Sequence, residues 1–225
     1  MTMLNKLFIH NFLKILIVNF RFLPFKQAIH LPIDVYGKLR ILSYKGNIKI
    51  ESEILRPGMI KLGSQGRDMF PNDAVILDVR GTLVFKGPFY IGCGSTLRVE
   101  EGATLTIGAK SRIGACSVVF CESGITIGNL VEISWKSQIM DTDRHEMQDT
   151  VTGKIYPSRA PITIGDSVWI GNNVLINKGC KIASNTIVAS CSLCNKNYGD
   201  LPPYSVIGGI PAKQIASNKA RIWEE

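Results

Sequence analysis

The feature that most constrains this chain is an aliphatic residue that returns every six positions. A Gly, Ala or Ser commonly follows this residue, and a small residue lies four places after it. The phase survives a two-residue insertion at Ile125 and Thr126 and a longer interruption after Ile139. The hexads begin at Ile91, Leu97, Ile107, Ile113, Val119, Ile127, Ile133, Ile139, Ile164, Ile170, Ile176, Ile182, Val188 and Cys194.

This period predicts a mainly β fold, a parallel β-helix of hexapeptide repeats over residues 75–200. Three hexads form one triangular coil, with the aliphatic residues inside and the Gly or Ser residues easing the corners. Successive coils satisfy each other's backbone hydrogen-bonding groups. We expect the insertion at Ile125 and Thr126 to bulge outward at a coil boundary without shifting the inward register.

The stretch IMDTDRHEMQDTVTGKIYPSRAP interrupts the repeat between Ile139 and Pro161. Because a coil filled with aliphatic side chains leaves no room for chemistry, function is expected on loops or between copies of the coil. We therefore predict an extended loop over residues 141–161, since inserts of this length are usually functional or disordered. Flat triangular prisms pair naturally around a threefold axis, which predicts a homotrimer.

Residues 1–74 are expected to form an accessory region made of a helix and short strands. Pro24 ends a helical stripe, and no aliphatic run in this region is long enough to span a membrane. The helix either covers the open end of the main domain, which we favour, or lies as a basic amphipathic segment on an anionic membrane. Both alternatives place the protein in the cytoplasm, in the second case peripherally at the membrane. The stripe consists of Leu4, Leu7, Phe8, Phe12 and Ile15.

Charge and cysteine content limit the partners and the kinds of site that we expect. The net charge is +8, and residues 1–74 carry 11 Lys and Arg against 5 Asp and Glu. This excess suits an anionic surface or ligand, while the absence of a Lys/Arg run argues against nucleic acid as a partner. The six cysteines are scattered apart from a single C-x-x-C at Cys191 and Cys194. We expect reduced, mostly buried thiols and no metal site.

Four motifs between residues 75 and 215 resemble the hexapeptide-repeat acyltransferases, the family of maltose, galactoside, serine and xenobiotic acetyltransferases. The similarity is greatest to O-acetyltransferases of bacterial surface-polysaccharide biosynthesis. The resemblance implies a left-handed parallel β-helix, assembled as a homotrimer, that transfers an acetyl group from acetyl-CoA in clefts between subunits without a metal. The motifs are DTDRH (141–145), APITIGDSVWIG (160–171), IVASCSLCNK (187–196) and GGIPAK (208–213).

The resemblance assigns the chemistry to the loop and to the turn before it. His145 occupies the place of the family's loop histidine and is the expected general base, because a neutral imidazole accepts a proton at cellular pH. Asp143 is the expected partner of its ring, as in the logic of a catalytic triad. Asp141, Trp135 and Lys136 are expected at the acceptor, although many family members carry Asn at or near Lys136.

The resemblance also predicts how acetyl-CoA is held. Trp169, at an outward place of its hexad, takes the family's aromatic position along the coenzyme. Small residues at Gly171, Ala189 and Ser190 would let the pantetheine lie against the coil, although relatives usually carry Gly or Ala in place of Ser190. For the phosphates, the lysines of two family motifs are expected as partners. These are Lys196 and Lys213, the second in a motif where Ile210 replaces the usual Asn.

The predicted function is transfer of acetyl from acetyl-CoA to a hydroxyl of a sugar or polysaccharide precursor. N-acetylation of an amino-sugar nucleotide and a non-catalytic β-helix scaffold remain as alternatives. A zinc site of the γ-carbonic-anhydrase kind needs three histidines, and only His145 lies in the coil region. A nucleotidyltransferase of this fold needs a Rossmann-like domain, which the first 70 residues, without a Gly-rich phosphate loop, do not supply.

Overall fold

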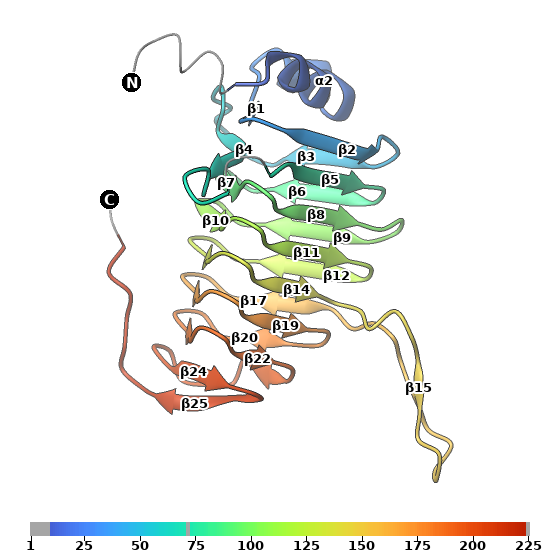
Figure 1. Ribbon diagram of the computed structural model, residues 1–225, viewed down its shortest axis with the longest axis vertical. Helices are drawn as coiled ribbons and strands as arrows, with labels where there is room; N and C mark the ends of the chain where they lie inside the picture. The colour runs from blue at the N-terminus through green and yellow to red at the C-terminus, as the bar shows by residue number, and fades with distance from the viewer. Residues whose placement is uncertain (1–9, 71–72, 224–225) are drawn as a thin grey trace.

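The computed structural model describes residues 10–70 and 73–223, which form a tall prism of three parallel sheets (Figure 1). Each sheet takes one strand from each turn of the chain, so strands that neighbour each other in a sheet come from successive coils. The prediction of a parallel β-helix is thereby confirmed, and the architecture matches that of left-handed β-helix structures. Among the described residues, no helix has the length and apolarity needed to cross a membrane.

The strands divide among the sheets as follows. The first sheet holds β1 (Ile33–Val35), β4 (Ile60–Gln65), β7 (Phe89–Gly92), β10 (Ser111–Ile113), β13 (Glu132–Ile133), β18 (Trp169–Ile170), β21 (Ile187–Val188), β24 (Val206–Gly209) and β25 (Ala212–Ala216). The second sheet holds β2 (Leu39–Ser43), β5 (Val75–Val79), β8 (Thr96–Val99), β11 (Val118–Cys121), β14 (Gln138–Met140), β19 (Leu175–Asn177) and β22 (Leu193–Cys194). The third sheet holds β3 (Asn47–Ile50), β6 (Thr82–Phe85), β9 (Thr104–Ile107), β12 (Gly124–Ile127), β17 (Ile162–Ile164), β20 (Lys181–Ile182) and β23 (Asn197–Tyr198).

The residues that begin the hexads fill the interior of the prism. All of them are at most 3% exposed. They also stack in register, as Ile133 pairs with Ile170 and Ile170 with Val188. Full burial of one such side chain contributes about 1.5–3 kcal/mol, so this column is the main source of stability.

The insertion at Ile125 and Thr126 does not bulge outward, and that prediction is wrong. Both residues lie within β12, and Ile125 is 1% exposed and pairs with Leu105 and Ile162. Because side chains alternate between the faces of a strand, Ile125 and Ile127 point to the same interior. The two extra residues therefore lengthen the strand and add a second buried aliphatic side chain to this coil.

The N-terminal end of the prism is covered by α2 (Phe12–Phe22), followed by the short α3 (Phe25–Ala28) (Figure 1). Helix α2 ends just before Pro24, as predicted, but its buried stripe is formed by Ile15, Val18, Asn19 and Phe22. Phe12 of the expected stripe is instead 59% exposed. Its other members Leu4, Leu7 and Phe8 lie outside the described residues.

Asn19 closes the edge of the first sheet. Its fully buried side-chain amide donates to the carbonyl oxygens of Ile15 and Ile33 at 2.8 and 2.7 Å. Its oxygen accepts from the N–H of Ile33 at 3.0 Å. The backbone of β1 is thus hydrogen-bonded on the side that faces the helix. The parallel sheets begin here, at Ile33, well ahead of residue 75 where the sequence analysis starts the coil.

At the other end, β24 and β25 form an antiparallel hairpin, the last pairing of the first sheet. The chain then runs back along the outside of the prism (Figure 1). A hydrogen bond from Lys219 N–H to Tyr204 O at 3.1 Å and an ion pair between Arg221 and Glu132 hold this tail against the coil. The tail therefore returns toward coils that lie far from it in sequence.

Candidate active site

Residues 141–161, called the arm below, leave the prism between β14 and β17 and project from it (Figure 1). The arm is a hairpin in which β15 (Met147–Gln148) pairs antiparallel with β16 (Ile155–Tyr156). At its tip the Asp149 carboxylate accepts the N–H groups of Val151 and Thr152 at 2.9 and 2.8 Å. These hydrogen bonds lower the pKa of Asp149. The predicted extended loop is therefore an ordered two-stranded element.

Asp141 fixes the point at which the arm leaves the prism. Its side chain is fully buried, and its oxygens accept the backbone N–H groups of Glu122, Ser123 and Gly124 at 2.7, 2.8 and 2.7 Å. Hydrogen bonds to an ionised acceptor are about twice as strong as neutral ones. The sequence analysis places Asp141 at the acceptor. In the structure its carboxylate is committed to the corner of the coil above.

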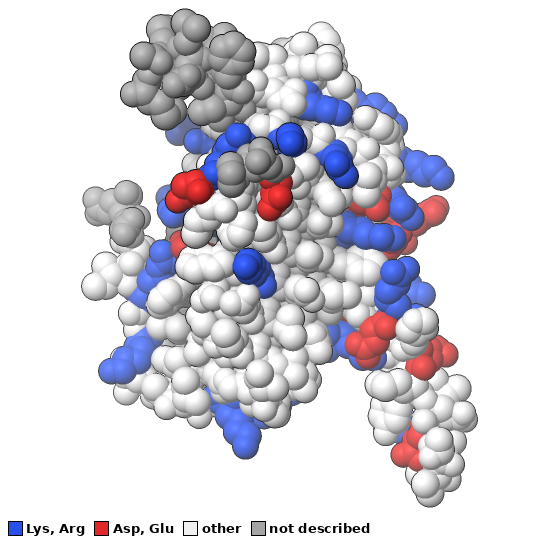
Figure 2. Space-filling model, in the orientation of Figure 1, with Lys and Arg blue, Asp and Glu red and all other residues white. Residues whose placement is uncertain are grey.

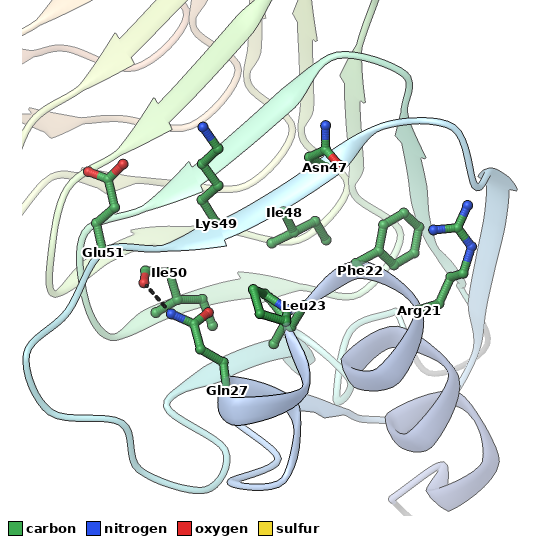
Figure 3. Close-up of a pocket in the computed structure, with 10 residues that line it drawn as sticks. Arg21, Phe22, Leu23, Gln27, Asn47, Ile48, Lys49, Ile50 and Glu51 are labelled. Atoms are coloured by element: carbon green, nitrogen blue, oxygen red, sulfur yellow. Dashed lines mark hydrogen bonds between the residues drawn. The ribbon is translucent and has the colours of Figure 1, made fainter.

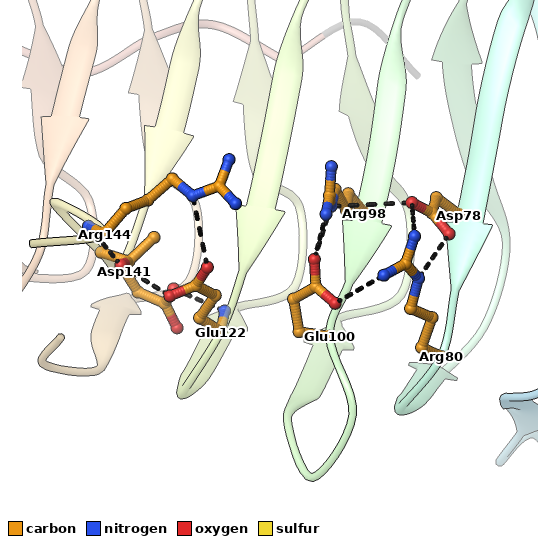
Figure 4. A network of polar contacts seen from close by, with 8 residues as sticks. Asp78, Arg80, Arg98, Glu100, Glu122, Asp141 and Arg144 are labelled. Carbon is orange, nitrogen blue, oxygen red and sulfur yellow. Dashed lines mark hydrogen bonds and ion pairs between the residues drawn. The ribbon is translucent and has the colours of Figure 1, made fainter. Parts of the chain in front are cut away.

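A second set of contacts ties the arm to the outer face of the second sheet (Figure 4). Thr142 Oγ1 donates to Glu122 Oε2 at 2.7 Å and accepts from the N–H of Arg144 at 2.8 Å. The Arg144 guanidinium lies 5.5 Å from the centre of the Phe120 ring, and Arg98 lies 4.8 Å from the same ring. Phe120 thus connects the arm to a row of charged residues on the neighbouring coils, namely Asp78, Arg80, Arg98 and Glu100.

Asp143 lies at the base of the arm and contacts the coil below. Its carboxylate meets Lys178 Nζ at 2.6 Å, and the same ammonium donates to the carbonyl oxygen of Pro157 at 2.6 Å. Lys178 therefore joins both strands of the arm to one corner of the prism. The sequence analysis assigns Asp143 to the His145 ring. Among the described contacts, its ionic partner is Lys178, which sequence reasoning missed.

His145 follows this fixed base and is exposed to solvent. The preceding residue, Arg144, has a φ of 63°, a left-handed conformation that is uncommon for a side chain of this size. The hydrogen bond from its N–H to Thr142 and its contact with Phe120 hold it there. The backbone that carries His145 is therefore set by several independent contacts.

A different edge of the prism brings together five residues that the sequence analysis assigns to the acceptor or the coenzyme. This edge, called the Trp135 edge, lies between the first and second sheets and consists of residues 134–137, 171–174 and 189–192. The N–H of Asn173 donates to Trp135 O at 3.1 Å, and Ser137 Oγ donates to Gly171 O at 3.1 Å. The five residues are Trp135, Lys136, Gly171, Ala189 and Ser190.

The coils of the Trp135 edge approach each other closely at Gly171. A Cβ added to Gly171 would lie 2.6 Å from Ser190 N, closer than real Cβ atoms come. The N–H of Gly171 donates to Val188 O at 2.9 Å and that of Ala189 to Ile207 O at 2.8 Å. These amides hold the coils together. The Gly171 N–H is therefore already engaged, and acyl transfer at this edge would need another group as the hydrogen-bond donor to the oxyanion of its transition state.

The Trp169 side chain lies on the outer face of the first sheet, as its place in the hexad predicts, and is 36% exposed while Ile170 beside it is fully buried. The Arg221 guanidinium of the C-terminal tail lies 5.3 Å from the Trp169 ring and 4.5 Å from the Trp223 ring. An Arg221–Glu132 ion pair of 2.7 Å holds this arrangement. The tail thus places a cation against two indoles at the corner between the third and first sheets, where Ser167, Asn185 and Tyr204 lie.

The two predicted phosphate-binding lysines lie in different places. Lys213 pairs with Gly208 in the terminal hairpin, and a Cβ added to Gly208 would lie 2.9 Å from Ala189 Cβ. Lys213 therefore follows the Trp135 edge toward the C-terminal end. Lys196 lies between β22 and β23, at the corner of the arm, with its Nζ 5.6 Å from the centre of the Tyr198 ring.

One copy of the chain therefore divides the predicted residues between two edges. Asp143, His145 and Lys196 lie at the edge between the second and third sheets, which we call the arm edge, whereas five residues predicted for the acceptor or the coenzyme lie on the Trp135 edge. The strands of the second sheet separate them, and three residues such as those of β14 span about 10 Å. A single prism therefore does not bring the arm edge and the Trp135 edge together.

The comparisons with known proteins agree with this architecture. Residues 161–196 match the family model described as "Bacterial transferase hexapeptide (six repeats)". The chain is 32% identical over 117 residues to the galactoside O-acetyltransferase of Escherichia coli (strain K12), a match that covers 51% of this chain and 54% of that protein. A chloramphenicol acetyltransferase of Morganella morganii is 48% identical over 52 residues, 23% of each chain. The chain thus spans about half or less of these relatives.

Two further matches extend over more of the chain. A protein of Escherichia coli (strain K12) named "Putative lipopolysaccharide biosynthesis O-acetyl transferase WbbJ" is 22% identical over 170 residues, 65% of this chain and 85% of that protein. The crystal structure of the polySia-specific acetyltransferase NeuO superposes with a TM-score of 0.53 at 22% identity, covering 86% of this chain and 90% of that one. This structural likeness establishes the shared fold.

Proposed function

Because the repeats of this chain are those of the hexapeptide-repeat transferase family, we propose that it is an acetyltransferase that moves an acetyl group from acetyl-CoA to a hydroxyl of a sugar or polysaccharide precursor. The names of the relatives support the reaction, since they are acetyltransferases of galactosides, of chloramphenicol and of lipopolysaccharide biosynthesis. We place the reaction in the cytoplasm, where acetyl-CoA is available.

One observation carries the proposal. The arm holds His145 on a fixed base away from its own coil, while the residues suited to the substrates lie on the Trp135 edge. A second copy, rotated about an axis parallel to the prism, would bring its Trp135 edge to this arm. Three such copies close the arrangement, and the apolar side chains exposed on the arm then gain a partner. These are Met147, Val151, Ile155 and Tyr156.

In this scheme His145 is the general base. Its imidazole accepts the proton of the acceptor hydroxyl as that oxygen attacks the thioester carbonyl. It returns the proton to the sulfur of coenzyme A as the carbon–sulfur bond breaks. Asp143 and Lys178 act by fixing the arm rather than by touching the reacting atoms. The Arg144 backbone sets the direction from which the ring approaches.

The Trp135 edge suits the extended pantetheine chain of acetyl-CoA. Gly171, Ala189 and Ser190 present small side chains in a row, and Trp169 lies beside this row. Lys213 lies farther along the same line and would meet the phosphates, with Lys196 supplied by the arm edge of the neighbouring copy. Trp135 and Lys136 would then face the acceptor, closest to the incoming His145.

The test is whether the purified protein transfers the acetyl group from acetyl-CoA to any of a panel of sugars and glycans. Release of the coenzyme A thiol and the mass of the product would measure the transfer. Replacing His145 by Ala should lower turnover by about 10² to 10⁴ with little change in the KM for acetyl-CoA. His30→Ala is the matched control, because His30 is also exposed but lies in the N-terminal region. Light scattering should give three times the chain mass of 24.8 kDa.

Several results would contradict the proposal. Undiminished transfer by the His145→Ala protein removes this residue as the base, and a monomeric protein that is fully active removes the site between copies. A preference for amino sugars over hydroxyl acceptors replaces O-acetylation by N-acetylation. If no acceptor or water ever receives the acetyl group, the coil is a scaffold.

A further inference from the structure

Helices α2 and α3 turn an apolar surface outward at the N-terminal end of the prism. It is formed by six side chains that are 48–72% exposed, and we call it the cap face. Residues 12, 16 and 20 follow one another at helical spacing, and the rings of Phe20 and Phe25 lie 6.2 Å apart. The surface is therefore continuous from one helix to the other. Its members are Phe12, Leu13, Leu16, Phe20, Phe25 and Ile29.

The cap face is not explained by the packing of α2 on the coil. That contact already uses the opposite stripe of the helix, from Ile15 to Phe22. A helix on the surface of a globular protein normally carries polar residues on its outer side, and one that is apolar all round is buried on both sides. The outer side of α2 therefore has the composition of a surface that is covered by another apolar partner, in addition to the coil that covers its inner side.

The surroundings of the cap face are cationic. Residues 10–56 carry eight Lys and Arg against three Asp and Glu. Two of the three acids have cationic or histidine partners, since Asp34 meets His10 and Glu51 meets Lys86. Figure 2 shows Lys and Arg side chains gathered around the upper part of the molecule. An apolar face with a basic border is complementary to the surface of an anionic membrane.

A cavity of about 570 Å³ lies at the border of the cap face, between the two helices and β3 (Figure 3). Arg21 lines one side of it and Lys49 another, and the Gln27 side chain reaches from α3 to the strand, where its Nε2 donates to Ile50 O at 3.1 Å. The Arg21 guanidinium lies over the Phe22 and Tyr44 rings, 5.7 and 6.0 Å from their centres. The Arg21 charge is thus held against the rings and also donates to the carbonyl oxygen of Tyr44, whereas Lys49 on β3 is exposed.

We infer that the cap face docks on a phospholipid bilayer that contains anionic headgroups. The apolar side chains enter the boundary between headgroups and acyl chains, and the exposed cations, Lys26 and Lys49 among them, meet the phosphates. The binding is peripheral, because the inserted element is the outer half of a helix whose inner half stays packed on the coil. This inference does not depend on the proposed enzymatic activity, since its readout is vesicle binding.

The test is co-sedimentation of the full-length protein with vesicles of phosphatidylcholine alone or mixed with phosphatidylglycerol. We expect sedimentation with the mixed vesicles that weakens as salt is raised. The double variant Leu13→Gln/Leu16→Gln should bind at least about tenfold more weakly, because it removes two apolar side chains that would enter the bilayer and leaves the packed stripe intact. Lys26→Gln/Lys49→Gln should reduce the preference for phosphatidylglycerol and lessen the effect of salt.

Ile215→Gln is the matched control, since Ile215 is 61% exposed on β25 at the opposite end of the prism. Its vesicle binding should equal that of the unmodified protein. The inference is overturned if the protein does not sediment with anionic vesicles, or if Leu13→Gln/Leu16→Gln binds as tightly as before. It is also overturned if Ile215→Gln loses as much binding. A lower mass of the double variant in light scattering without vesicles would show that another copy covers the cap face.

Discussion

Asp143 and Lys178 form an ion pair of 2.6 Å that joins the base of the arm to the next coil of the prism. The same lysine binds the carbonyl oxygen of Pro157 on the returning strand, so one ammonium group holds both sides of the hairpin. The pair is about a fifth to a third exposed, which places it at the boundary between protein and solvent. Its position two residues before His145 makes it a determinant of where that ring points.

Replacing Lys178 by Met should therefore lower turnover while leaving the KM for acetyl-CoA nearly unchanged. We expect a loss of about tenfold, the size of effect that a displaced catalytic group produces when it is still present. Steady-state kinetics with both substrates would measure it. Lys181→Met, at an exposed position on β20, is the control and should behave as the unmodified protein. Equal kinetics for the two variants would mean that the ion pair does not position the arm.

Asp141→Asn should destabilise the folded protein by about 1–3 kcal/mol, because three backbone N–H groups would lose an ionised acceptor in a buried corner. The free energy of unfolding from urea titration would show the loss. The control is Glu146→Gln in the exposed part of the arm, which should unfold at nearly the same urea concentration as the unmodified protein. A stable Asp141→Asn protein with impaired acceptor binding would return this residue to the role that the sequence analysis assigns to it.

Two tryptophans should separate the two substrates. Trp169→Ala should raise the KM for acetyl-CoA, and Trp135→Ala the KM for the acceptor, each by about tenfold or more, since truncation removes a large apolar contact. Each variant serves as the control for the other. If both variants affect the same substrate, the order of binding along the Trp135 edge that we propose is wrong.

Thiol reactivity should report on the Trp135 edge. Burial raises the pKa of Cys121, Cys180 and Cys194 to about 12, so almost none of these groups is a thiolate at pH 8. Cys191 is exposed and follows Ser190 on the Trp135 edge. A disulfide reagent at pH 8 should react first with Cys191, and Cys191→Ser should abolish this fast phase.

Saturating acetyl-CoA should protect Cys191 from the reagent if the coenzyme lies along the Trp135 edge. Unchanged reaction in its presence would place the coenzyme elsewhere. Unfolding in urea should make the buried cysteines reactive in both proteins, which provides the internal reference for the count of thiols.

The hexad phase explains how much of the fold is readable from sequence. Ile133, Ile170 and Val188 stack on each other because each begins a hexad, and the arm inserted between the first two does not disturb the phase. The first coils escape detection because longer connections separate their strands. Ile33 pairs with Ile60 and Ile60 with Phe89, at separations of 27 and 29 residues, whereas Ile170 and Val188 are 18 residues apart, which is the length of three hexads.

Only the part of the candidate site that follows the hexad repeat could be predicted from the sequence. The hexad phase already places Trp135 above Asn172 and Ser190, so the Trp135 edge could have been derived from the repeat alone. The contact between Asp143 and Lys178 could not, because it depends on the direction in which the arm leaves the coil. Arg221 reaches Trp169 only because the tail reverses after the terminal hairpin, a path that carries no periodic signal.

The way in which Asn19 hydrogen-bonds to Ile33 has a consequence for assembly. A column of stacked parallel coils is, in its backbone, one segment of a fibre that could add further molecules end to end at the spacing of a cross-β structure. The Asn19 side chain supplies both a donor and an acceptor to β1, and so takes the place of the strand that a further coil would add. At the opposite end the reversed strand β25 does so with its main chain. Both ends of the first sheet therefore oppose the end-to-end addition of further molecules, and the column keeps the number of coils that one chain supplies.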